Sequence, residues 1–285
     1  MTIAVTGATG HLGRLIVEQL LARGVAPDEI VATGRNAQRL AELEKLGVRT
    51  GVASYDDPSS VESALAGVDT LVLVSGSEVG HRARQHANAI AAAERAGVGH
   101  IVYTSSPHAD SSRMAIAPEH KATEDLLAAS PAEATVLRNN WYNENYEQAF
   151  AQAAATGTYL ASTGAGRVAS ASRIDFAEAA AVVATTGARR GEVLELAGDG
   201  AWDGTDFAAI AGRVLGRDIT FAGVSQEEHR QALTGAGLPE SVIEFLVTLD
   251  ADIAAGELDG PTGVLSGLIG RPTTTLEQTL RTYTA

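Results

Sequence analysis

The sequence predicts an α/β fold, in which a doubly wound parallel sheet is joined to a smaller, mostly helical C-terminal lobe. One observation and one rule of chain topology lead to this prediction. Short β-branched runs alternate with longer amphipathic segments through the first 140 residues, and strands that alternate with helices form βαβ units with parallel strands. Right-handed crossovers then place helices on both faces of the sheet.

Six strands are expected in this first part, each as a short apolar or β-branched run. They fall at residues 2–6, 29–33, 48–52, 70–74, 100–104 and 134–137. The run at 70–74 is continuously apolar, which is typical of a strand buried on both faces. Helices are expected between the strands, at 11–23, 37–46, 57 onward, 81–96 and 119–129. Asp57 is suited to the N-cap of the third helix and Pro58 to its first position.

The alternation stops near residue 140. A helix at 175–185 and a strand at 193–196 are expected next, followed by helices at 205–215, 226–234, 239–254 and 275–283. We therefore expect an N-terminal domain of residues 1–140 and a smaller lobe of residues 141–285, with some segments of the lobe returning to the sheet.

Composition excludes several classes of function. The 285 residues carry 21 Lys and Arg against 35 Asp and Glu, a net charge of −14. This charge argues against nucleic-acid and anionic-membrane partners, which need clustered basic residues. The absence of cysteine excludes disulfides and thiolate metal sites, and the seven histidines show no metal-binding spacing. The sequence has neither a signal peptide nor a long apolar run, so we expect a cytoplasmic protein without a metal.

The strongest local motif is the glycine-rich segment Gly7-Ala8-Thr9-Gly10-His11-Leu12-Gly13, which follows a strand and opens a helix. In that context Gly7 allows a sharp turn, Gly10 allows a pyrophosphate to approach the backbone, and Gly13 allows close helix–strand packing. The helix N-terminus supplies N–H groups and partial positive charge to phosphates. The motif therefore predicts a Rossmann-type dinucleotide site, although a purely structural turn would use the same glycines.

Arg35 follows the second strand, 22 residues after Gly13. An acidic residue near this position selects NAD, whereas an arginine suits the 2′-phosphate of NADP. We therefore expect NADPH as the cofactor, with a surface arginine as the alternative. Small polar residues end the fourth and fifth strands, Ser75-Gly76-Ser77 and Ser105-Ser106, and they would leave room for the nicotinamide ribose or simply terminate the strands.

Together these residues resemble the atypical short-chain dehydrogenase/reductases of the NmrA-like group, and among them the type 2 NAD(P)H:quinone oxidoreductases. The resemblance extends over essentially the whole chain and is most specific in the block from Arg138 to Tyr142. Its motifs are Gly7–Gly13, Arg35, Ser75–Gly80, Tyr103–Ser105, Ala117–His120, Leu137–Tyr146, Glu195–Gly198 and Ile269–Thr275. The resemblance implies that Asn139, Asn140 and Trp141 line the nicotinamide, and that Asn140, Trp141 and Tyr142 contact the substrate.

One departure from the wider superfamily bears on mechanism. Enzymes of the superfamily that act on alcohols carry a Tyr four residues before a Lys, but Ala117 stands four residues before Lys121. A positioned proton donor is typically worth about 10²–10⁴-fold in rate. A quinone tolerates this loss, because its reduction yields a stabilised phenolate that takes a proton from water. Lys121 and Tyr142 are the candidates for a catalytic role.

Other polar residues near the motifs are given ordinary roles. His108 and His120 are expected on a loop or a helix surface, with proton transfer near neutral pH as the alternative. Glu119 and Glu124 are expected as solvated acids of a helix. Trp141 and Tyr142 offer flat surfaces to an aromatic substrate, with core packing as the alternative.

The sequence thus predicts an NADPH-dependent quinone reductase. Related folds often form dimers, so a homodimer is considered as its assembly. The alternative is an NmrA-like redox sensor that binds NAD(P) without turnover and regulates a protein partner. The missing tyrosine is compatible with either.

Overall fold

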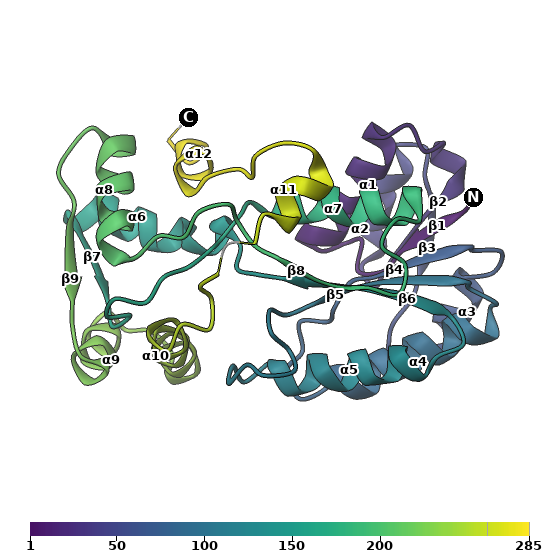
Figure 1. Cartoon of the computed structure of the whole chain (residues 1–285), viewed down its shortest axis with the longest axis horizontal. Coiled ribbons are helices and arrows are strands. Elements are labelled where there is room, and N and C mark those ends of the chain that lie inside the picture. The colour runs from purple at the N-terminus through teal and green to yellow at the C-terminus, as the bar shows by residue number, and fades with distance from the viewer. Residues whose placement is uncertain (261, 285) are drawn as a thin grey trace. The chain divides into compact units, whose positions relative to one another are not determined.

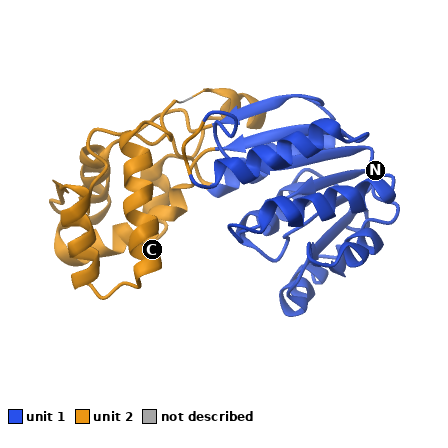
Figure 2. Ribbon diagram, turned by 90° about the horizontal axis from the view of Figure 1, so that it is seen from below, with its two compact units in different colours: residues 1–111, 115–139, 173–196 blue, residues 112–114, 140–172, 197–285 orange. Residues whose placement is uncertain are grey.

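A computed structural model describes residues 1–260 and 262–284 (Figure 1). The chain divides into two compact units, coloured blue and orange in Figure 2. Unit 1 comprises residues 1–111, 115–139 and 173–196, and unit 2 comprises residues 112–114, 140–172 and 197–284 of the described chain.

Unit 1 is built on a seven-stranded sheet with the order β3-β2-β1-β4-β5-β6-β8. All its pairings are parallel, with Ile3 opposite both Ile30 and Thr70, and Val136 opposite Val193. The strands are β1 (Ile3–Val5), β2 (Ile30–Gly34), β3 (Arg49–Val52), β4 (Thr70–Leu73), β5 (His100–Ser105), β6 (Glu133–Asn139) and β8 (Val193–Leu196). The order reverses at β1, which pairs with β2 on one side and β4 on the other, and such switch points are where open α/β sheets bind ligands.

Helices cover both faces of this sheet (Figure 1). They are α1 (His11–Ala22), α2 (Ala37–Glu44), α3 (Pro58–Ala64), α4 (Arg82–Arg95), α5 (Ala117–Ala129) and α7 (Arg173–Thr186). Helices α1 and α7 pack together on one face, and α3, α4 and α5 pack in sequence on the other. A single 3-10 turn, η1 (Pro27–Glu29), precedes β2.

The predicted fold class is confirmed, and the local reasons behind it hold. All four residues of β4 are buried, as a strand covered on both faces requires. The Asp57 side chain accepts hydrogen bonds from the backbone N–H groups of Ser59 and Ser60, and Pro58 is the first residue of α3. Strand β6 is longer than expected and runs on to Asn139.

Unit 2 is mostly helical. Its elements are η2 (Asn143–Tyr146), α6 (Glu147–Thr156), β7 (Thr158–Ala161), α8 (Gly204–Leu215), β9 (Thr220–Gly223), α9 (Gln226–Gly235), α10 (Glu240–Ala254), α11 (Val264–Ile269) and α12 (Leu276–Arg281). Strands β7 and β9 pair in parallel as a separate two-stranded sheet. Neither strand was expected from the sequence, and the same is true of α6 and α11.

An aromatic cluster forms part of the interior of unit 2. The rings of Tyr159 and Phe207 lie 4.2 Å apart between centroids, and those of Tyr146 and Trp202 lie 4.6 Å apart at nearly a right angle. Trp202 also donates from its indole N–H to Ser170 Oγ at 2.8 Å. Edge-on contacts of this kind add to the stabilisation from burial.

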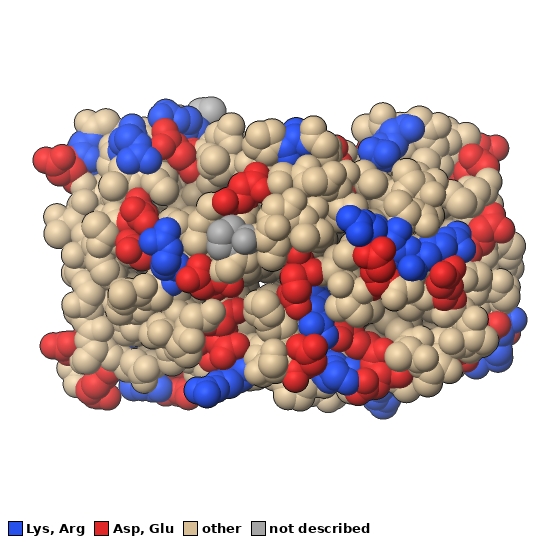
Figure 3. Space-filling model, in the orientation of Figure 1, with Lys and Arg blue, Asp and Glu red and all other residues tan. Residues whose placement is uncertain are grey.

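Within the described residues, no helix is both long enough and apolar enough to cross a membrane. On the face shown in Figure 3, most basic side chains lie beside acidic ones. The ion pairs on the surface of unit 1 include Arg95 with Glu62 and Arg84 with Asp56.

Candidate cofactor site

The glycine-rich turn joins β1 to α1 as the sequence predicts. Gly7 has a φ of +60°, a left-handed conformation that favours glycine. A Cβ atom on Gly13 would lie 2.3 Å from the Gly7 carbonyl oxygen, so only glycine fits where the helix passes the turn. No side chain caps the start of α1, and its first turn contains no acidic residue. This helix end therefore presents N–H groups to an anion.

Two arginines lie near this turn. Arg35 directly follows β2 and its side chain is 63% exposed, so it is accessible to a ligand. Arg39 lies one helical turn further along, and its guanidinium donates to the Thr9 carbonyl oxygen at 2.9 Å. Arg39 was not predicted from the sequence, because its hydrogen bond to Thr9 joins two segments 30 residues apart.

Arg35 already has a carboxylate partner within unit 1. Its Nη1 atom lies 2.5 Å from Oε1 of Glu78, in the loop between β4 and α4. The other carboxylate oxygen of Glu78 accepts from Gln85 Nε2 at 3.2 Å. These hydrogen bonds, with that from Arg35 the stronger, lower the pKa of Glu78 below its usual value.

The loop after β4 is held by side chains from the neighbouring elements. The Ser75 N–H donates to Thr104 Oγ1 at 3.0 Å, and the Gly76 N–H donates to His86 Nε2 at 3.0 Å. The Gly76 carbonyl oxygen accepts from Arg82 Nε at 2.5 Å. Both polar groups of Gly76 are therefore fixed by α4, in the segment that was expected to meet the nicotinamide ribose.

The protonation of His86 follows from its partners. Its Nε2 accepts from Gly76, so the proton of the neutral ring is on Nδ1, which lies 2.9 Å from Thr123 Oγ1. Thr123 in turn donates to the Glu119 carbonyl oxygen at 2.9 Å. Burial, reinforced by the nearby charge of Arg82, lowers the pKa of His86 to about 4. The ring therefore remains neutral near pH 7.

The expected surface positions of three residues on α5 are wrong. His120 is buried, with Nδ1 2.8 Å from the Tyr103 hydroxyl, and burial lowers its pKa to about 3. Glu119 forms an ion pair with Arg82, and its side chain is only 16% exposed. Glu124 is buried against Arg138. Each of these side chains faces the sheet or α4, whereas sequence reasoning assigned them to the solvent by residue type.

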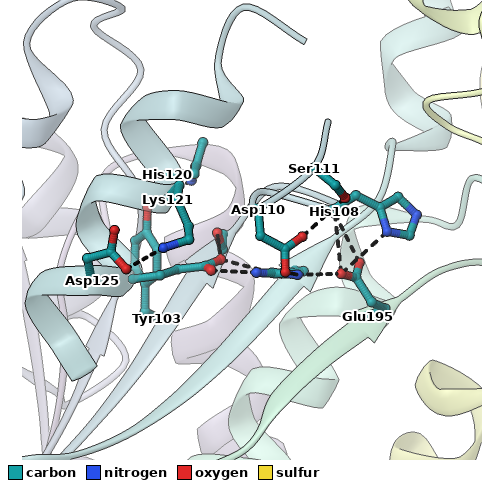
Figure 4. A network of polar contacts seen from close by, with 11 residues as sticks. Tyr103, His108, Asp110, Ser111, His120, Lys121, Asp125 and Glu195 are labelled. Atoms are coloured by element: carbon teal, nitrogen blue, oxygen red, sulfur yellow. Dashed lines mark hydrogen bonds and ion pairs between the residues drawn. The ribbon is translucent and has the colours of Figure 1, made fainter. Parts of the chain in front are cut away.

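The buried guanidinium of Arg138 lies among carboxylates near the carboxyl ends of β5, β6 and β8. Figure 4 shows two of these carboxylates, those of Asp110 and Glu195. The Arg138 guanidinium makes two hydrogen bonds to Glu124, at 3.0 and 2.6 Å, and lies within 3.1 Å of both Glu195 and Asp110. These partners, Glu124 first, raise the pKa of Arg138. The Ser105 hydroxyl also donates to Glu124, at 2.6 Å. Ser105 is thus engaged in the protein interior.

His108 lies in the loop after β5, as expected, with a φ of +48°. Its backbone N–H donates to the Glu195 carboxylate at 3.2 Å. The ring Nδ1 lies 3.6 Å from the same carboxylate.

The neighbouring residues Asn139 and Ser106 have polar groups without protein partners. Asn139 is 5% exposed, and neither its amide nitrogen nor its oxygen has a hydrogen-bond partner among the described residues; the same holds for Ser106 Oγ. Side chains alternate along a strand, so Asn139 faces away from the side of β6 on which Arg138 meets α5. Buried polar atoms without partners are costly, and here they are suited to a polar ligand at the sheet's carboxyl edge.

Three of the predicted residues, Asn140, Trp141 and Tyr142, lie in unit 2. Asn140 is buried and donates to the Leu258 carbonyl oxygen at 3.2 Å. Trp141 and Tyr142 are half-buried, and the Trp141 carbonyl oxygen accepts from the Ala171 N–H at 3.2 Å. Tyr142 forms a parallel bridge with Ala171. The backbone of this segment is therefore fixed within its own unit.

Lys121, a candidate catalytic residue, is partly exposed on α5 and forms an ion pair with Asp125 one turn further along (Figure 4). Among the described residues, no group of three His, Cys, Asp or Glu side chains is arranged to hold a metal ion.

Comparison with known proteins places these features in a wider context. The family model described as NAD(P)H-binding matches residues 7–186. Quinone oxidoreductase 2 of Escherichia coli (strain K12) is 42% identical over 278 residues, which are 98% of this chain and 97% of that protein. The crystal structure of the NADPH-dependent quinone oxidoreductase QOR2 of the same species, complexed with NADPH, matches with a TM-score of 0.95 over 100% of both chains.

A second structural neighbour is the Citrobacter sp. triphenylmethane reductase complexed with NADP(H). It is 33% identical, with a TM-score of 0.94 over 99% of this chain and 100% of that one. The family model covers more than half of the chain, including the glycine-rich turn, Arg35 and the Ser75–Ser77 loop. From its sequence and its fold alike, the chain belongs to the NAD(P)H-binding family.

Proposed function

We propose that this protein is an NADPH-dependent quinone reductase that reduces quinones to hydroquinones by direct hydride transfer. The observation that carries the proposal is the full-length likeness to the quinone oxidoreductase 2 of E. coli, at 42% identity over 98% of the chain. The geometry of unit 1 supports it, because it presents donors to phosphates and buried polar atoms that need a partner.

The residues of unit 1 fit such a cofactor. The turn at Gly7 and the uncapped start of α1 suit the pyrophosphate, and the exposed guanidinium of Arg35 suits a 2′-phosphate. The unpartnered amide of Asn139 suits the polar groups of the nicotinamide end. We propose that the cofactor contacts are Gly7, Thr9, Gly10, His11, Leu12, Gly13, Arg35, Ser75, Gly76, Ser77, Asn139, Asn140 and Trp141.

When bound, NADPH supplies the hydride. The chain's own contribution is to bind the cofactor and the quinone, to orient them towards each other, and to exclude competing reactions. The Tyr103 hydroxyl is buried against His120, and Ala117 stands where a proton-donating tyrosine would be needed. A quinone makes no such demand, because its reduced anion takes a proton from water. We propose Asn140, Trp141 and Tyr142 as the quinone contacts. Lys121 and Tyr142 are the candidates for donating a proton or stabilising negative charge, if the reaction uses either.

The test is to measure NADPH oxidation with benzoquinone-type and menadione-type acceptors. The loss of NADPH absorbance monitors the reaction. We expect one NADPH to be consumed for each hydroquinone formed. If NADPH binds tightly but no acceptor stimulates its oxidation, the reductase proposal fails and a cofactor-binding redox sensor takes its place.

The choice of cofactor has its own test. We expect Arg35→Asp to weaken NADPH binding far more than NADH binding, because only NADPH carries the 2′-phosphate. Equal losses for both cofactors would contradict the assignment of Arg35.

We further propose that the protein acts in the cytoplasm, and that it forms a homodimer, as related folds often do. Cell fractionation tests the first statement and light scattering of the purified protein tests the second.

A further inference from the structure

The loop between β4 and α4 carries an anion that reaches the proposed phosphate ligand. Glu78 forms an ion pair with Arg35, with 2.5 Å between Oε1 and Nη1. Arg35 is the residue to which the proposed function assigns the 2′-phosphate of NADPH. The same guanidinium therefore has an internal carboxylate partner and an external phosphate partner.

We infer that Glu78 is a specificity-determining residue that competes with the 2′-phosphate of NADPH for Arg35. The inference rests on the proposed function, since it requires NADPH as the cofactor. Both anions use the planar donor fork of one guanidinium. A phosphate monoester carries between one and a half and two negative charges near pH 7, so it outcompetes a single carboxylate but must displace it first.

The surroundings keep Glu78 close after such a displacement. Its second oxygen is held by Gln85 Nε2 at 3.2 Å, and the same nitrogen lies 3.1 Å from Asp56 Oδ2. When Arg35 turns to the phosphate, Glu78 therefore remains within reach of the guanidinium and continues to compete for it. NADH lacks the phosphate, so its binding leaves the Arg35–Glu78 pair intact.

The exchange requires no opening of the core. The side chains of Arg35 and Glu78 are 63% and 39% exposed, so a rotamer change is sufficient. Glu78 also belongs to the loop that carries Ser75, Gly76 and Ser77, whose backbone is held by β5 and α4. Displacing Glu78 from Arg35, at the adenosine end of the cofactor, thus affects a loop that is proposed to contact the nicotinamide end.

The first experiment measures the dissociation constants of NADPH and NADH by titration calorimetry, without any quinone. Glu78→Gln keeps the side chain's size and removes its charge. We expect NADPH to bind about two- to fivefold more tightly, the range of an exposed ion pair, and NADH to bind as before. The gain should shrink as ionic strength rises.

The matched control is Glu62→Gln, which removes the charge from another exposed pair, Arg95 with Glu62 at 2.6 Å. Neither dissociation constant should change in this variant. A similar tightening in Glu62→Gln would mean that the effect reflects net charge alone, and it would overturn the inference.

A double-mutant cycle separates competition from simple repulsion. In an Arg35→Ala background, Glu78→Gln should no longer improve NADPH binding, because the contested cation is absent. An undiminished gain in that background would overturn the inference, as would weaker NADPH binding by Glu78→Gln alone. If the wild-type protein does not bind NADPH at all, the proposed function fails. If it binds NADPH but the NADPH-to-NADH ratio is unchanged by Glu78→Gln, only the inference fails.

Discussion

The backbone N–H of Gly76 donates to Nε2 of His86, 3.0 Å away, from a loop at the carboxyl edge of the sheet to a neutral, buried ring. Arg82 holds the carbonyl oxygen of the same glycine. The shape of the loop that we propose to face the cofactor is thereby set by the first two turns of α4. A loop fixed in this manner is pre-organised, because its ordering entropy is lost on folding and not on binding.

His86→Leu should weaken both the fold and NADPH binding. Leucine leaves the Gly76 N–H without its acceptor, at a cost of about 1–3 kcal/mol. His86→Gln, whose side-chain oxygen can accept from Gly76, should recover part of the NADPH affinity. Urea denaturation and NADPH titration of both variants test this. Equal NADPH affinity in the Leu and Gln variants would show that the hydrogen bond does not position the loop.

The protein should lose stability as pH falls from about 6.5 towards 4. Burial lowers the pKa values of His86 and His100 to about 4 and that of His120 to about 3, whereas unfolded histidine titrates near 6.5. Between these values the unfolded chain binds more protons than the native chain, so protonation favours unfolding. Each pKa unit corresponds to about 1.4 kcal/mol.

The measurement is the urea midpoint at a series of pH values. His100→Gln should make the urea midpoint depend less steeply on pH. Glutamine does not titrate, so this position no longer binds a proton in the unfolded chain that it lacks in the folded one. An identical slope in the wild type and in this variant would contradict the contribution of His100.

Gly13→Ala should destabilise the turn and weaken NADPH binding. The new Cβ would lie 2.3 Å from the Gly7 carbonyl oxygen, so the turn or the helix must shift by enough to disturb the proposed phosphate site. Gly235→Ala is the control, because no atom lies within 4 Å of a Cβ placed there. Wild-type binding by Gly13→Ala would mean that the close approach is not needed for the cofactor.

Arg138→Met should be among the most destabilising single substitutions in unit 1. It leaves Glu124, Glu195 and Asp110 without their shared cation, and removing one partner of a buried ion pair costs about 3–5 kcal/mol. The exposed ion pair of Arg95 with Glu62 gives the comparison. Arg95→Met should lower the free energy of unfolding by less than about 1 kcal/mol. Denaturant unfolding of the two variants measures the difference, and similar losses would contradict the importance of burial.

Trp141→Ala should raise the KM for quinones while leaving the dissociation constant of NADPH within a few-fold of the wild type. The indole is half-buried and can present a flat surface to an aromatic ring. Trp202→Ala, in the aromatic cluster of unit 2, should instead lower stability. An unchanged KM in Trp141→Ala would assign Trp141 to packing.

The sequence predicted the sheet of unit 1 well because most of its strands, such as β1, β2 and β4, are local apolar runs followed by a periodic helix. Strands β7 and β9 gave no such signal. Each has four residues, and they pair across some sixty intervening positions, so their stability depends on tertiary contacts and not on local pattern.

The site was predictable where backbone geometry demands a residue type, as at Gly7 and Gly13. It was not predictable where a charged side chain is buried through a distant partner, as with Glu124. One signal was available: Arg138 interrupts a buried strand next to Val136 and Leu137, and a buried arginine requires a carboxylate. Arg35 was predicted as a phosphate ligand, but its pairing with Glu78 depends on the loop conformation.

The last strand of the large sheet has a consequence for synthesis on the ribosome. Strand β6 is complete at Asn139, but its outer neighbour β8 is made only at residues 193–196, after α6, β7 and α7. During that interval the nascent chain has an exposed strand edge that contains Val136 and Leu137, and such edges template wrong pairings. Rapid docking of residues 173–196 should therefore protect the yield of folded protein as well as its final stability.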